Sequence, residues 1–139
     1  MLDKAIVWAA EQMKRDGLEN VGTPRVRVPH WVRGAERAAI IEPVNRPLTM
    51  LGLGGSIATP RNGITAQVVP VGSFDELNRK GRSEVEGKIV LFNVAYESYG
   101  RTVEYRHGGA SRAGKLGAVA ALVRSSNHVS LQTPPPGTI

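Results

Sequence analysis

The sequence predicts a β-rich α/β domain built around one strand–helix–strand unit. Two short apolar runs mark the strands, Ile89–Phe92 and Ala118–Val123. Runs this short and this apolar are typical of strands buried on both faces of a sheet. The connection between them is too long for a hairpin, so we expect a parallel pair joined by a right-handed crossover.

A helix is predicted for that crossover. Its expected inward stripe is spaced by four, three and four residues: Val103, His107, Ala110 and Gly114. Lys115 falls in the last turn, and Gly117 stands where a left-handed cap ends many helices. Gly108 and Gly109 interrupt this helix at a cost of roughly 1 kcal/mol each, which predicts a local break or close packing on the sheet.

Two further helices are predicted from apolar spacing and capping residues. The first carries a stripe that ends before Gly17: Leu2, Ile6, Ala9, Ala10 and Met13. Ser73 and Glu76 form a capping box for the second, over 74–80, which Gly81 should end.

Short strands are expected elsewhere, at 38–43 and 64–71. The alternating stretch 25–34 predicts an edge or bulged strand, because Pro29 removes a ladder donor. Residues 44–47 are expected to be a crossing point between layers or domains.

Composition limits the class of protein. The 139 residues are enough for one domain, and 41% hydrophobic and 22% charged residues are ordinary for a globular chain. No apolar run approaches the length of a bilayer span, so no membrane partner is expected. The residues after Met1 lack a basic region followed by an apolar one, so we expect no secretory signal here. The absence of cysteine excludes disulfides, thiolate catalysis and cysteine-bound zinc.

A net charge of +6 and a pI near 10.2 raise an anionic partner as an alternative function. The candidate surface is one face of the stretch 25–34: Arg25, Arg27, Trp31 and Arg33. Such a face could neutralise and stack on nucleic acid, or bind a glycosaminoglycan. Because the basic residues are scattered over the whole chain, a solvated or interdomain face is the favoured interpretation.

The residues do not predict a self-contained active site. His30, His107 and His128 are far apart, and no zinc-ligand spacing or nucleophile elbow is present. The glycine-rich loop 52–56 could cradle a phosphate, but Pro60 prevents a helix from following it, so a tight turn or close backbone approach is favoured. His107 is interpreted as a packed structural histidine more readily than as a functional one.

Five segments nevertheless resemble one family. They are VRVPHWVRGAE (26–36), LGLGGSIATP (51–60), SFDEL (73–77), EGKIVLFN (86–93) and YGRTVEYRHGGASRAGKLGAVAALVRS (99–125). In order and in sequence they resemble the plasma glutamate carboxypeptidase, or carboxypeptidase Q, family. Its members are secreted and lysosomal di-zinc metallopeptidases that cleave dipeptides and small peptides, and they carry an inserted protease-associated (PA) domain.

The resemblance implies a division of the chain. Residues 1–43 would be the first helix and strands of a truncated aminopeptidase-type domain. Residues 44–126 would be an incomplete PA-like sheet or sandwich that contains the strand–helix–strand unit. Residues 127–139 would be a loose proline-rich tail.

The resemblance also implies what this chain lacks. The family's zinc ligands and catalytic glutamate lie beyond the PA insert, so no catalytic or metal residue can be assigned here and no cofactor is expected. We expect a non-catalytic lid whose partner is the missing catalytic domain, with possible homodimer contacts. Six residues are candidates for lying near substrate: Gly54, Gly55, Ser56, Tyr105, Arg106 and His107.

Overall fold

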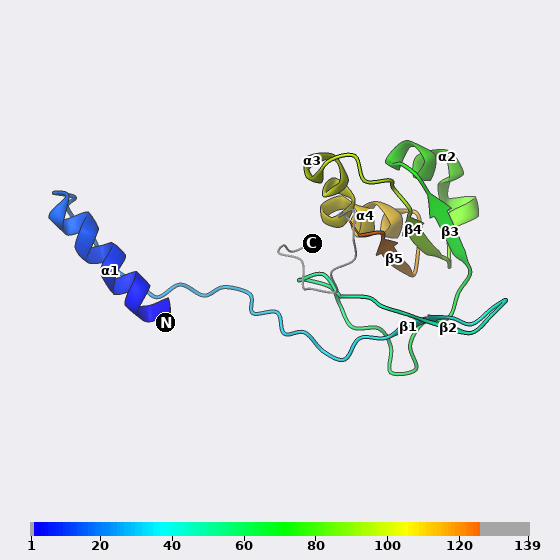
Figure 1. Ribbon diagram of the computed structural model, residues 1–139, viewed down its shortest axis with the longest axis horizontal. Coiled ribbons are helices and arrows are strands. Elements are labelled where there is room, and N and C mark those ends of the chain that lie inside the picture. Colours follow the sequence, from blue (N-terminus) through cyan, green and yellow to red (C-terminus); the bar gives the residue numbers. More distant parts are fainter. Residues whose placement is uncertain (1, 126–139) are drawn as a thin grey trace. The chain divides into compact units, whose positions relative to one another are not determined.

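The computed structural model describes residues 2–125, which form a mixed α/β structure with two small sheets (Figure 1). The chain forms two compact units, residues 1–30 and residues 31–139, and each is described by itself. Within the described range no helix is long and apolar enough to cross a membrane. The elements are, in order, α1 (Leu2–Arg15), β1 (Ala38–Ile40), β2 (Arg46–Leu48), β3 (Val68–Val71), α2 (Phe74–Val85), β4 (Ile89–Phe92), α3 (Tyr99–Thr102), α4 (Glu104–Lys115) and β5 (Ala120–Val123).

The first unit contains α1, as the apolar stripe predicts. Its carboxyl end is a Schellman motif, because the Leu18 N–H donates to the Met13 carbonyl and the Gly17 N–H to the Lys14 carbonyl, both at 3.1 Å. Gly17 supplies the left-handed conformation that this motif needs, with φ +82°. No residue of α1 is buried.

The second unit is built on a parallel sheet in the order β3-β4-β5, with Val68 opposite Ile89 and Ile89 opposite Ala120. The predicted strand–helix–strand unit is therefore confirmed, although its second strand is two residues shorter than expected. The strand predicted at 64–71 pairs only over β3. The Schellman motif at the end of α4 contains the expected left-handed Gly117, with φ +85°.

The core lies on one face of this sheet, where α2 packs on β3 and α4 packs on β4 and β5. It consists of buried residues from both strands and helices: Val69, Val71, Leu77, Val85, Val90, Phe92, Tyr105 and Ala113. On β4 only alternate residues, Val90 and Phe92, are fully buried. The prediction of a strand buried on both faces is therefore wrong, because the helices that connect the strands cover a single face.

The predicted inward stripe of α4 is also wrong. The buried residues of this helix are Tyr105, Arg106, Gly109 and Ala113, whereas His107, Ala110 and Gly114 are exposed. Two residues orient the helix: Tyr105, which forms an aromatic cluster with Phe74 and Phe92, and Gly109, which lies against the Phe92 ring. Its helical path is continuous through Gly108 and Gly109, so there is no break, and of the two glycines Gly109 marks close packing, against Phe92.

Two segments before β3 differ from their predictions. Residues 25–34 form no strand. In the part of this stretch that belongs to the second unit, the side chains of Trp31 and Arg33 bond to residues 52–56 in place of a backbone ladder. Residues 44–47 are not a crossing point: β2 turns back antiparallel to β1, with Ala38 opposite Leu48.

Helix α2 begins at its predicted capping box, with the Glu76 N–H donating to Ser73 Oγ at 3.0 Å. The predicted stop at Gly81 is a kink with φ +63°, after which one more turn brings Val85 into the core. The expected tail, residues 127–139, lies outside the described residues. The assignment of residues 1–43 and 44–126 to separate domains stays a prediction.

Candidate functional site

The glycine-rich loop 52–56 forms a tight turn held by a side chain from another segment. The Ser56 N–H donates to the Leu53 carbonyl at 3.0 Å, and Gly55 has φ +90°. Before the turn, the Gly52 N–H donates to the Glu36 carboxylate at 2.8 Å. A Cβ on Gly52 would clash with the same carboxylate oxygen, so a larger residue here would push the Glu36 carboxylate away from this amide.

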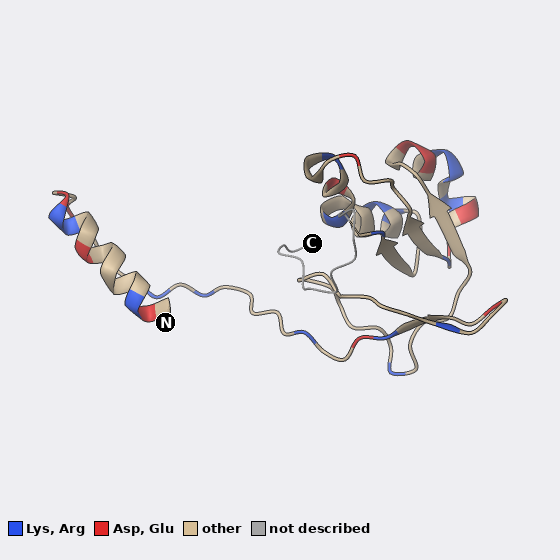
Figure 2. Cartoon of the chain, in the orientation of Figure 1, with Lys and Arg blue, Asp and Glu red and all other residues tan. Residues whose placement is uncertain are grey.

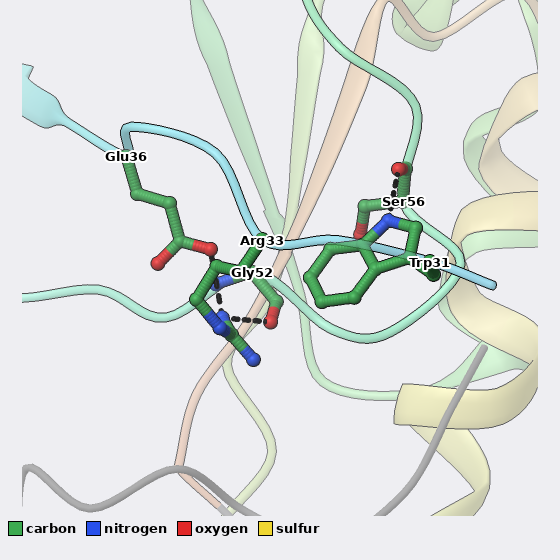
Figure 3. A network of polar contacts seen from close by, with 5 residues as sticks. All are labelled: Trp31, Arg33, Glu36, Gly52 and Ser56. Carbon is green, nitrogen blue, oxygen red and sulfur yellow. Dashed lines mark hydrogen bonds and ion pairs between the residues drawn. The ribbon is translucent and has the colours of Figure 1, made fainter.

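The Glu36 carboxylate is the centre of a polar clamp, which we define as Trp31, Arg33, Glu36, Gly52 and Ser56 (Figure 3). Arg33 Nη1 lies 2.7 Å from Glu36 Oε1 and also donates to the Gly52 carbonyl. Trp31 Nε1–H donates to the Ser56 carbonyl at 2.9 Å. An amide that could have faced a phosphate therefore binds the chain's own carboxylate, in agreement with the close-approach interpretation.

The clamp also uses two members of the basic and aromatic face expected at 25–34. The Arg33 guanidinium lies 5.1 Å from the centre of the Trp31 ring, within cation–π range, while it pairs with Glu36. Arg25 and Arg27 are exposed but belong to the other unit. Figure 2 shows Lys and Arg spread along both units and interspersed with Asp and Glu.

The second group of candidates begins at Tyr105, which is only 9% exposed. Its ring centre lies 4.4 Å from that of Phe74 and 5.6 Å from that of Phe92. Burial raises the pKa of the Tyr105 hydroxyl, and the negative charge of Glu104 raises it further. Tyr105 is thus a core residue of the sheet–helix interface.

The remaining candidates differ in exposure. Arg106 is buried, with 7% of its surface exposed, and His107 is exposed, contrary to the packed histidine that the stripe predicted. The loop 52–56 is held by the polar clamp, whereas Tyr105 is held by the aromatic cluster. Whether these residues lie near a substrate stays a prediction.

A shallow hollow that the sequence did not predict follows the end of β4. It has a volume of about 250 Å³ and is lined by Val94, Ala95, Glu97, Arg101, Thr102, Glu104 and Tyr105. Glu97 pairs with Arg101 at 2.6 Å, which raises the Arg101 pKa. The sequence could have indicated this hollow through the position of its lining residues, which begin just after the predicted strand 89–92. Residues that follow the carboxyl end of a parallel strand often form ligand sites.

The residues that the structure describes do not form a zinc site. Among residues 2–125, no group of three His, Asp or Glu side chains is arranged so that it could hold a metal ion. A catalytic zinc site needs about three protein ligands on rigid elements. The described residues therefore do not fit the zinc that the resemblance implies, and we assign no chemical step to it.

The sequence is similar to individual known proteins along nearly its whole length. No protein-family model matches the sequence. Carboxypeptidase Q of Rattus norvegicus is 52% identical over 130 residues, which are 94% of this chain and 27% of the rat protein. Carboxypeptidase Q of Homo sapiens is 49% identical over 136 residues, which are 98% of this chain and 29% of the human protein.

A solved structure has the same fold. The peptidase M28 precursor of Shewanella amazonensis SB2B matches with a TM-score of 0.72 and 32% identity, over 91% of this chain and 30% of that chain. The chain thus spans less than a third of the length of the curated relatives it matches. By this homology, which extends over nearly all of its residues, the chain belongs to the carboxypeptidase Q family.

Proposed function

We propose that this chain is a non-catalytic, PA-like scaffold segment of a carboxypeptidase Q-type peptidase. The relatives named above are a carboxypeptidase and an M28 peptidase, and the chain matches less than a third of each. In this proposal, dipeptide or small-peptide hydrolysis and the zinc that it needs belong to sequence outside these 139 residues. The setting would be secreted or lysosomal, as expected for the family.

One structural observation carries the proposal: the side chains of the polar clamp and the candidate Tyr105 are used to hold the chain together. The Glu36 carboxylate binds Arg33 and the Gly52 amide. Tyr105 packs in the core with a raised pKa, which leaves it protonated and uncharged at neutral pH. Side chains engaged in this way stabilise a scaffold and are poorly placed to transfer protons to a substrate.

The test measures dipeptide hydrolysis by the purified chain during a zinc titration, with an intact carboxypeptidase Q as the positive control. We expect no zinc-dependent turnover by the chain. Measurable hydrolysis that rises with zinc and disappears with a chelator would refute the proposal.

The same preparation distinguishes the alternative of a basic binding module. A module that neutralises several phosphates or sulfates is retained on heparin with a steep logarithmic dependence on salt. Because Trp31 and Arg33 already bind within the clamp, we expect weak retention with a shallow slope.

A further inference from the structure

The β1–β2 hairpin is too short to hold its own arms together. Its ladder contains three residue pairs, and one of them includes Pro47, which has no N–H to donate. Isolated two-stranded hairpins are marginally stable at best. Contacts beyond the ladder are therefore needed to keep the two arms side by side.

The polar clamp supplies contacts of this kind on the same two arms. Glu36 lies two residues before β1, and its partner Gly52 lies four residues after β2. Trp31 lies seven residues before β1, and its partner Ser56 lies eight residues after β2. The clamp thus continues the antiparallel path of the ladder with nearly unchanged register, using side-chain-to-backbone bonds.

The outermost contact of the clamp lies where the second unit begins. Trp31 is the first residue of that unit, and it bonds to Ser56, 25 residues further along the chain. With this contact formed, the chain between them is a closed loop. Closing a loop of this length costs chain entropy, and loss of the contact would restore that entropy. The same residues would then be a flexible connection between α1 and the sheet.

We propose that the polar clamp is a latch that determines whether residues 31–56 are a closed loop or an extended linker between α1 and the sheet of β3, β4 and β5. Glu36 is its central group, because one carboxylate oxygen accepts from both Arg33 and Gly52. The latch opens locally, since the residues of the hydrophobic core all lie between Val69 and Ala113, outside the clamp. This inference is independent of the proposed peptidase-scaffold function.

The test uses the full 139-residue chain carrying Trp8→Phe, which leaves Trp31 as the single tryptophan. Trp8 lies on α1 and is 63% exposed, so its replacement leaves the clamp intact. Two variants open the latch by different means. Glu36→Ala removes the acceptor, and Gly52→Ala places a methyl group against the carboxylate.

Gly34→Ala is the matched control. It lies in the same arm, between Arg33 and Glu36, and a Cβ there meets no atom within 4 Å. Trp31 exposure is measured by acrylamide quenching of its fluorescence, and local opening by hydrogen exchange of residues 51–56. The amides of β3, β4 and β5 in the same molecules report whether the sheet stays folded.

We expect both opening variants to increase Trp31 quenching about twofold and exchange at 51–56 about tenfold. The sheet amides and the Gly34→Ala variant should remain like the parent. The proposal fails if Trp31 quenching and exchange at 51–56 are unchanged in both opening variants. It also fails if the sheet amides accelerate equally, because the clamp would then be part of one cooperative fold.

Discussion

The two adjacent glycines of α4 should respond to alanine with opposite signs. A Cβ on Gly109 would lie 2.8 Å from Phe92 Cε2 and 3.1 Å from Cδ2. A Cβ on Gly108 would lie 3.7 Å from Arg112 Nε and 3.8 Å from Phe74 Cζ, which are ordinary contacts. Both glycines are in the interior of a regular helix, so backbone effects of the two substitutions are matched.

The magnitudes follow from propensity and packing. Alanine in place of a helix-interior glycine stabilises by up to about 1 kcal/mol, and Gly108→Ala should show a gain of ~0.5–1 kcal/mol. At Gly109 the methyl group meets a ring that is fully buried and lies 5.6 Å, centre to centre, from both Phe74 and Tyr105. Overpacking of this kind costs about 1–3 kcal/mol, so Gly109→Ala should be less stable than the parent by ~1–2 kcal/mol.

Urea unfolding followed by far-ultraviolet circular dichroism measures both differences. The described part of the second unit, residues 31–125, is in the size range of about 60–100 residues for which each 1 kcal/mol corresponds to roughly 4–8 °C in Tm. Thermal unfolding should therefore separate the two variants as well. Phe92→Leu in the Gly109→Ala background should recover part of the loss, because it removes the ring edge that the methyl group meets. Equal stability of the two glycine variants, or strict additivity with Phe92→Leu, would refute the packing argument.

Two further predictions concern α2 and Tyr105. Ser73→Ala should destabilise by about 1 kcal/mol in the same urea assay, because Ser73 Oγ accepts the Glu76 N–H at the start of α2. Ser83→Ala on the same helix is the control, since its hydroxyl makes only an exposed 3.5 Å contact, and equal losses would count against the cap. The pKa of Tyr105 is raised on folding, so its contribution to stability is present below about pH 10 and is lost as the pH rises through the folded value. Tyr105→Phe should remove the upward-shifted phenolate transition from an absorbance titration, whereas Tyr99→Phe, a change at an exposed ring, should leave that transition in place.

Features that depend on neighbouring residues could be predicted from the sequence. The start of α2 follows from Ser73 and Glu76, because a hydroxyl acceptor three residues before a helical amide stabilises that end in any context. The ends of α1 and α4 follow from Gly17 and Gly117 for the same reason: only a left-handed residue completes the motif. The strand at 89–92 follows from its apolar run.

Features that depend on distant residues could not be predicted. Glu36 and Gly52 are 16 residues apart, and neither the charge of one nor the flexibility of the other indicates the partner. The orientation of α4 was predicted incorrectly because apolar spacing favoured Val103, His107 and Ala110. The Tyr105 ring and the glycine that accommodates Phe92 determined it instead.

The packing of Tyr105 with Phe74 and Phe92 bears on the proposal that this chain is a non-catalytic scaffold. The chain contains two phenylalanines, and both pack with Tyr105 where α2, β4 and α4 meet. Tyr105 packs in this cluster and is only 9% exposed, so what it offers a ligand is limited to the part that lines the hollow after β4. Of the adjacent candidates, Arg106 is buried as well, so His107 alone presents an exposed side chain. Among the residues expected near substrate, His107 is therefore the exposed member of 105–107. Any contact from the loop 52–56 would depend on whether the polar clamp is closed.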